Sequence, residues 1–288
     1  MFTRRTLLKS ICLTSFALPA VHLLGSEKQS AGIKQSVCYG AYRKIPLDEL
    51  APAIKKIGLV GLDLVNPDEW EAVQKHGLIV TLSRAPGATI GKGFNHTKNH
   101  EALIAHYSEL IPAAAKANVK SIICFSGNRE GISDEEGLEN AAKGLKQLMP
   151  LAEQHGVVLI MELLNSIVNH KDYQADHTDW GAELAKRIGS ENFKLLYDIY
   201  HLQIMEGNLI YNIRKYKDAI GHYHTAGNPG RKDLDNEQEI YYPAVIRAIL
   251  ETGFQGYLAH EFSPKKQENL ESLQEAFRVC NVSLATNN

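Results

Sequence analysis

Four side chains that can bind a metal ion stand at the ends of four consecutive apolar runs. They are Glu162 in VVLIMEL, Asp198 in KLLYDIYH, His224 in AIGHYHTAG and Glu261 in GYLAHEF. Apolar runs of this kind are typical of parallel strands buried on both faces, and the carboxyl ends of neighbouring barrel strands converge. We therefore expect three carboxylates and one imidazole to meet at one end of the fold.

A divalent cation is the partner that this set of donors predicts. A lone acid at a strand end is often a helix cap, but four donors on successive strands would repel one another unless a cation lay between them. Oxygen and imidazole donors suit Mn²⁺, Mg²⁺ or Co²⁺, and Zn²⁺ is also accepted. A six-coordinate ion would keep two positions for a carbonyl and a neighbouring hydroxyl of a substrate, and would act as a Lewis acid.

The elements that must position these residues follow an alternating pattern. Eight apolar runs predict strands near residues 35–39, 60–65, 78–82, 119–125, 157–162, 194–198, 219–224 and 256–261. Helical spacing of apolar residues predicts helices over 101–117, 134–155, 181–188 and, with the weakest pattern, 207–215. Eight strand–helix units predict an α/β fold, a single (β/α)8 TIM barrel. An open doubly wound sheet is the alternative, but no glycine-rich turn follows the first strand.

Residues typical of helix ends support these boundaries. Ser133, followed by Glu136, has the spacing of a capping box, and Gly156 and Gly189 stand where helices should end. The prolines near helix starts occupy positions where proline costs least; they are Pro46, Pro67 and Pro243.

The first 31 residues have the pattern of an export signal. TRRTLLK at 3–9 matches a twin-arginine signal and precedes an apolar stretch at 11–24. An uncleaved membrane anchor is the alternative, but the stretch is shorter than the ~20 residues of a span and contains Pro19. We expect cleavage between Ala20 and Ala31, a periplasmic or secreted protein free of the membrane, and a barrel domain over 32–288.

Composition fits one globular domain with a small-molecule substrate. The chain has 288 residues, 44% of them hydrophobic, and a formal net charge of −2. Because four basic side chains lie in the first 31 residues, the barrel is more acidic than basic, which argues against a nucleic-acid partner. Cys38, Cys124 and Cys280 are expected to be buried free thiols, since the strands of the first two are not neighbours. A homo-oligomer is left open.

Several segments identify a family resemblance. The most specific are YDIYH (197–201), MEGN (205–208), IGH (220–222), NPGR (228–231) and EIYYP (239–243). In these segments, and over nearly all of its length after the signal, the chain resembles the xylose isomerase-like TIM-barrel superfamily of sugar isomerases and epimerases. It resembles most closely the hydroxypyruvate isomerase group of that superfamily.

The resemblance implies roles for individual residues. Glu162 and Glu261 match residues that bind the metal and also act as the acid–base pair on either side of the substrate. His201 and Arg231 match positions that contact substrate oxygens; a structural histidine and a surface loop residue are the alternatives. Glu206 would support the metal ligands or serve as a helix-start acid.

Two departures from the hydroxypyruvate isomerase group concern the substrate. That group carries glutamine where this chain has His224, whereas ketose 3-epimerases of the superfamily carry histidine there. The loop from 83 to 100 is also long, and such a loop over a barrel mouth is often a lid. His96 and His100 could contact substrate, although an ordinary solvated loop is the stronger interpretation.

The resemblance leaves several activities open. The preferred hypothesis is an aldose–ketose isomerase that acts on a small sugar or hydroxy-keto acid. Its reaction would pass through a metal-stabilised enediolate, with the two glutamates as acid and base. A ketose 3-epimerase, or a keto-sugar dehydratase or lyase, would use the same residues. A metal-dependent endonuclease would need more ligands on early strands, and a non-catalytic sugar-binding barrel would bind metal without proton exchange.

Overall fold

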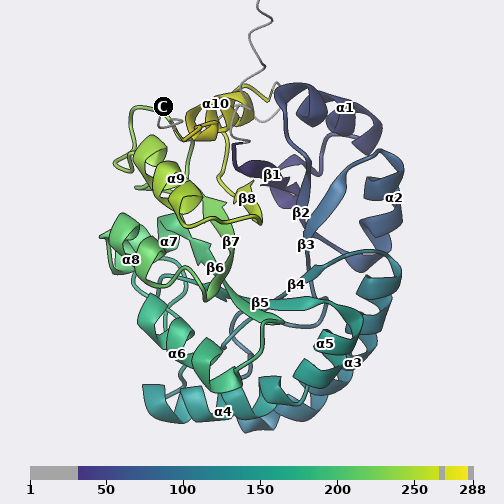
Figure 1. Ribbon diagram of the computed structural model, residues 1–288, viewed down its shortest axis with the longest axis vertical. Helices are drawn as coiled ribbons and strands as arrows, with labels where there is room; N and C mark the ends of the chain where they lie inside the picture. The colour runs from purple at the N-terminus through teal and green to yellow at the C-terminus, as the bar shows by residue number, and fades with distance from the viewer. Residues whose placement is uncertain (1–31, 266–269, 285–288) are drawn as a thin grey trace, which may run out of the picture.

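Eight parallel strands form a closed barrel, ordered around the ring as they are in the chain (Figure 1). The computed structural model describes residues 32–265 and 270–284, so the predicted signal at 1–31 lies outside the described residues. The strands are β1 (Lys34–Cys38), β2 (Gly61–Val65), β3 (Ile79–Ser83), β4 (Ser121–Cys124), β5 (Val158–Leu163), β6 (Phe193–Asp198), β7 (Ile220–Thr225) and β8 (Tyr257–His260). The predicted TIM barrel is confirmed.

Helices form an outer ring around these strands (Figure 1). They are α1 (Leu47–Ile57), α2 (Trp70–Lys75), α3 (His100–Lys116), α4 (Asp134–Lys146), α5 (Met149–His155), α6 (Thr178–Ile188), α7 (Ile199–Met205), α8 (Leu209–Lys215), α9 (Tyr242–Glu251) and α10 (Glu271–Cys280), with short 3-10 helices η1 (Tyr39–Tyr42), η2 (Pro67–Glu69) and η3 (Thr97–Asn99). Among the described residues no helix combines the length and the apolar character that crossing a membrane requires.

Two helical predictions were wrong in detail. The segment 134–155 is two helices, because α4 ends at Lys146 and α5 begins at Met149, with Pro150 in its first turn. Helix α7 was missed: it starts directly at the end of β6, where Asp198 accepts hydrogen bonds from two backbone amides and caps the helix. The predicted helix over 207–215 is α8.

Most predicted helix ends are confirmed. The Ser133 side chain accepts a hydrogen bond from the Glu136 amide, and Gly156 and Gly189 end α5 and α6 in the left-handed conformation. The three prolines stand at the start of α1, η2 and α9. Cys38, Cys124 and Cys280 are buried and free, as expected.

A bulge in β2 changes which side chains face the barrel interior. The pairing of β2 with β3 shifts register on both sides of Asp63, and Leu64 has a positive φ of 52°. Successive strand residues normally face opposite sides, and a bulge adds a residue that breaks this alternation. Leu64 therefore packs with the inner cluster of Leu82, Ile123 and Ile160, while its neighbour Asp63 contacts His224, which is also inside the barrel.

Candidate active site

The four predicted ligands come together inside the carboxyl end of the barrel. Glu162 lies in β5, Asp198 ends β6, His224 lies in β7 and Glu261 directly follows β8. Each side chain offers one ligand atom, and these atoms lie within 4.8 Å of one another. The first three residues are buried and Glu261 is partly exposed, so the cluster is open to solvent on one side. This arrangement can hold one metal ion.

Two carboxylate oxygens in this cluster fit a cation. Glu162 Oε1 and Asp198 Oδ2 are buried and have no hydrogen-bond partner among the described residues. A buried carboxylate oxygen without a partner is costly, and a cation removes that cost. The other oxygen of Asp198 accepts hydrogen bonds from the amides of Tyr200 and His201 at 2.8 and 3.1 Å, so one carboxylate both caps α7 and faces the cluster.

The two glutamates differ in their tendency to hold a proton. Burial raises the pKa of Glu162 to about 7, and the negative charge of Glu261 adds to this effect. Burial also opposes ionisation of Glu261, but Arg231 and His224 lower its pKa to about 2. Glu261 Oε2 lies 2.8 Å from the Arg231 guanidinium and 2.7 Å from His224 Nδ1. Glu162 therefore holds a proton more readily than Glu261 does.

Asp63 orients the imidazole of His224. His224 Nε2 lies 3.1 Å from Asp63 Oδ1, which leaves Nδ1 to face Glu261. The other oxygen of Asp63 lies 2.9 Å from His222 Nε2 and accepts a hydrogen bond of 2.7 Å from Thr81. Burial opposes a charge on His224, but the carboxylates of Glu261 and Asp63 raise its pKa well above the ordinary value.

Cys38 belongs to the same interior group. Its thiol lies 3.8 Å from Asp63 and 3.9 Å from His224, and the three residues could also surround an ion. Burial raises the pKa of this thiol well above its usual value, so that it stays protonated and donates toward Asp63. Neither Asp63 nor His222 was predicted. The signals were an acid inside the apolar strand GLDLV and a second histidine two residues before His224, hence on the same face.

His201 presents a free nitrogen near the cluster. Its Nδ1 accepts a hydrogen bond from the Asn165 amide at 3.1 Å, which places the proton of the neutral ring on Nε2. Burial lowers the pKa of His201 to about 4, and Nε2 is buried without a hydrogen-bond partner in the described structure, 3.7 Å from Asp198 Oδ2. This N–H can donate to a ligand.

Arg231 is more closely tied to the carboxylates than a substrate contact alone requires. It lies 2.8 Å from Glu261 and 3.7 Å from Asp198, and its carbonyl holds the Ser263 amide at 2.8 Å. The alternative of an ordinary surface residue does not describe this position. Its positive charge is the main reason why Glu261 is ionised despite burial.

A cavity of about 340 Å³ opens beside the cluster. Glu162 and Glu261 form one part of its wall, and the rest comes from the ends of β2 and β4 and from the loop after β3. The lining residues outside the cluster are Leu64, Asn66, Arg84, Ala85, Pro86, Gly87, Ala88, Ile90, Ile123 and Phe125. Cavities that bind small molecules commonly combine apolar walls with a few polar groups.

Three other candidate residues have structural contacts. His96 contacts the Arg129 carbonyl at 3.1 Å and His100 contacts the Phe94 carbonyl at 2.8 Å, so both tie down the 83–100 loop and neither lines the cavity. Glu206 accepts hydrogen bonds from the amide and hydroxyl of Thr178 at 2.6 and 2.7 Å. It therefore stabilises the start of α6 and does not contact the metal-ligand cluster.

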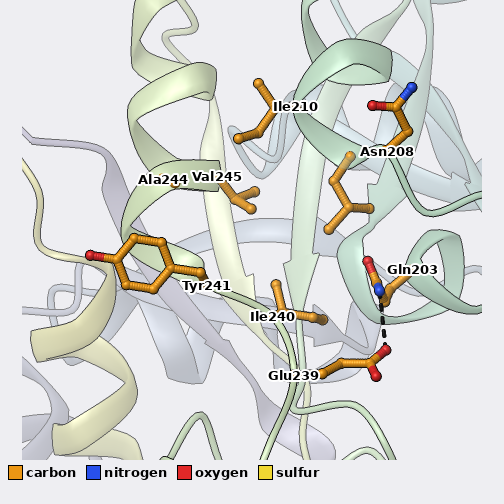
Figure 2. Close-up of a pocket in the computed structure, with 9 residues that line it drawn as sticks. Gln203, Asn208, Ile210, Glu239, Ile240, Tyr241, Ala244 and Val245 are labelled. Carbon is orange, nitrogen blue, oxygen red and sulfur yellow. Dashed lines mark hydrogen bonds between the residues drawn. The ribbon is translucent and has the colours of Figure 1, made fainter.

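A second hollow lies outside the barrel between α7, α8 and α9. Figure 2 shows Gln203 and Glu239 at one end, joined by a hydrogen bond of 3.1 Å, and the exposed ring of Tyr241 at the other. The hollow has a volume of about 250 Å³, and none of the four clustered ligands lines it. It is separate from the candidate active site.

Comparison with known proteins settles the family. Residues 39–280 match the family model of the xylose isomerase-like TIM barrel. The chain belongs to this family. The match includes all four clustered residues and every strand after β1.

Individual relatives carry isomerase and epimerase names. The chain is 29% identical to the hydroxypyruvate isomerase of Escherichia coli over 51% of this chain and 56% of that protein. It is 30% identical to the 2-oxo-tetronate isomerase of Cupriavidus necator over 40% of this chain and 43% of that protein. These matches span about half the length of the curated relatives. The D-psicose 3-epimerase of Clostridium cellulolyticum H10 is similar in fold, with a TM-score of 0.69, 17% identity and coverage of 86% and 96% of the two chains.

Proposed function

We propose that this protein is a metal-dependent isomerase of a small hydroxy-carbonyl compound, with Glu162 and Glu261 as the proton-transferring residues. The observation that carries the proposal is the meeting of Glu162 and Glu261 with Asp198 and His224 beside one cavity, with Arg231 2.8 Å from Glu261. The surroundings also raise the pKa of Glu162 to about 7 and lower that of Glu261 to about 2. Two titratable groups whose surroundings push their pKa values apart are typical of an acid–base pair. The isomerase names of the relatives point to the same class of reaction.

The ion would be held by Glu162, Asp198, His224 and Glu261, whose ligand atoms are already within 4.8 Å of one another. Mn²⁺, Mg²⁺ and Co²⁺ suit three carboxylates and one imidazole, and Zn²⁺ is also accepted. When bound, the ion supplies Lewis-acid polarisation of the substrate carbonyl. His201 Nε2, a buried donor beside the cluster, would hold a substrate oxygen.

The proton transfers follow from the charges of the two carboxyls. Glu261, kept ionised by Arg231, takes the proton from the carbon next to the carbonyl. Glu162 delivers a proton to the neighbouring carbon, and the hydroxyl proton passes to the former carbonyl oxygen. The carbonyl and the hydroxyl then exchange places without gain or loss of atoms.

A ketose 3-epimerase is the second candidate, and His224 favours it. Histidine at this position is what the family resemblance associates with ketose epimerases. The same two carboxyls would then act on opposite faces of one carbon. A keto-sugar dehydratase or lyase would share the first proton transfer and differ in the bond that breaks next.

The test follows a C–H proton in D₂O. The metal-loaded protein is incubated with hydroxypyruvate or with a ketose, and the products are identified by NMR. Deuterium incorporation with carbonyl migration supports the isomerase, and deuterium with inverted configuration supports the epimerase. Treatment with EDTA should stop the exchange. If no substrate exchanges a C–H proton while the ion is bound, the proposal is wrong.

The two glutamates are tested by substitution. Glu162→Gln and Glu261→Gln should each lower kcat by roughly 10²- to 10⁴-fold, because each removes a proton carrier. Circular dichroism should show the barrel intact. Glu101→Gln, at the exposed start of α3, is the matched control and should keep full activity. Near-normal turnover by either active-site variant would contradict the acid–base assignment.

A further inference from the structure

Arg84 is a cation in the candidate active-site cavity. It directly follows β3 and lines the cavity that Glu162 and Glu261 also line. Within residues 32–265 and 270–284, no carboxylate oxygen lies within salt-bridge distance of its guanidinium. It is the only basic residue in the described lining of this cavity.

Arg84 is held in place by backbone contacts. Its amide donates to the Val65 carbonyl at 2.9 Å, and its side-chain Nε donates to the Leu64 carbonyl at 3.0 Å. Leu64 is the bulge residue with φ of 52°, so the irregular end of β2 supplies the acceptor. A guanidinium fixed through Nε is ready to use its two terminal nitrogens in a bidentate contact.

The position of Arg84 in the ring places it across the barrel from His224. In a closed barrel of eight strands, β3 is four strands from β7, which carries His224, in either direction. Arg84, Glu162 and Glu261 line one cavity, so a substrate whose reacting carbons lie at the two glutamates can reach Arg84. The intervening wall of Leu64, Ile123 and Phe125 offers it no other charge.

The charges within the cluster are matched without Arg84. Arg231 lies 2.8 Å from Glu261 and 3.7 Å from Asp198, and a bound divalent cation would add to this compensation. Asp63, the remaining buried acid, contacts His222 and His224. The charge of Arg84 is thus available to the substrate.

We infer that Arg84 binds a carboxylate of the substrate, so that the substrate is a small hydroxy-oxo acid and not a neutral ketose. This inference rests on the proposed function, since it names the substrate class of the same site. One guanidinium with two free nitrogens suits the two oxygens of a carboxylate.

The kinetic test uses a matched pair of substrates. Hydroxypyruvate and dihydroxyacetone differ only in a carboxylate that replaces a hydroxymethyl group. Arg84→Gln should lower kcat/KM for hydroxypyruvate about 10- to 100-fold, because hydrogen bonds to charged groups have about this effect. It should change kcat/KM for dihydroxyacetone less than about twofold. Arg84→Lys keeps the charge and should recover part of the loss.

Lys92→Gln is the control, because it removes one positive charge from the same loop without touching the cavity. It should leave both substrates unaffected, and the thermal midpoints of all variants should agree. Equal losses on both substrates, or none, would overturn the inference. A wild-type protein that prefers dihydroxyacetone, or an Arg84-dependent preference for dihydroxyacetone phosphate over hydroxypyruvate, would also overturn it.

A binding measurement separates this inference from the proposed function. Pyruvate has the carboxylate and the carbonyl but no hydroxyl to exchange, so its binding needs no turnover. Calorimetric titration of the metal-loaded protein should give a Kd that is about 10- to 100-fold weaker in Arg84→Gln than in the wild type. If no substrate reacts but this difference is present, the isomerase proposal fails and the carboxylate site stands. Equal Kd values would show that the carboxylate is bound elsewhere.

Discussion

At the scale of the residue, His224 depends on Asp63. The imidazole can present either nitrogen to the cluster, and the contact of Nε2 with Asp63 selects Nδ1. Metal-binding histidines commonly have such a carboxylate behind them, because it fixes the tautomer and the ring orientation. His222 and Thr81 hold the other oxygen of Asp63 in turn.

Asp63→Asn is therefore expected to weaken metal affinity by about 10- to 100-fold while the barrel remains folded. His224→Gln should change metal affinity or preference more strongly. Competition with a coloured chelator measures both. Asp233→Asn is the matched control, since Asp233 is also buried but binds Ser272 and the Lys265 amide away from the cluster. An unchanged metal affinity in Asp63→Asn would contradict the role of Asp63 in orienting His224.

At the scale of the element, a buried ion pair joins the segments after β4 and β5. Asp176 accepts hydrogen bonds from Arg129 at 3.0 Å and from Ser166 at 2.5 Å, and it lies 2.7 Å from His177. Burial opposes ionisation, but these contacts lower the pKa of Asp176 to about 2 and raise that of His177. The contacts hold the segment that begins α6.

Stability should follow the titration of this pair. The contribution of Asp176 to stability is complete above its unfolded pKa of ~4 and is lost as the pH falls toward 2. The contribution of His177 is complete below ~6.5 and is lost as the pH rises. Asp176→Asn should lower the free energy of unfolding by about 2 kcal/mol between pH 4 and 6. Urea unfolding at several pH values measures the difference.

Asp68→Asn serves as the comparison for this experiment, because Asp68 is exposed in η2. Its substitution should change the free energy of unfolding by less than about 0.5 kcal/mol at every pH. An effect of Asp176→Asn that stayed constant from pH 2 to 8 would show that the ion pair does not titrate as described.

At the scale of the whole molecule, metal binding should stabilise the barrel. The proposed ligands lie in or directly after four strands, so a bound ion would join segments spread over a hundred residues of sequence. A ligand that binds only the folded state at a hundred times its Kd adds about 2.7 kcal/mol. For a protein of this size we expect Tm to rise by roughly 5 to 10 °C.

Differential scanning fluorimetry with and without Mn²⁺, followed by EDTA, measures this shift. The double variant Asp198→Asn, Glu261→Gln should lose it, because two of the four ligands are gone. A shift of equal size in that variant would mean that the ion binds elsewhere.

Export by the twin-arginine signal and the oligomeric state stay predictions.

The sequence by itself determined the barrel and the residues of the cluster. Alternating apolar runs and helices leave few other folds, and Glu162, Asp198, His224 and Glu261 stand where strand ends must converge. The helix caps at Gly156 and Gly189 were equally local and equally predictable. Signals that depend on neighbours in sequence need no tertiary contact to be recognised.

Only the tertiary structure decided the contacts between distant strands. The bulge that turns Asp63 inward depends on the register between β2 and β3, and the ionised state of Glu261 depends on Arg231 in another loop. Arg84 was missed for the same reason, because the lack of a partner for a charge is a property of its surroundings. Charge interactions fall off with distance in space, and the sequence fixes those distances only after folding.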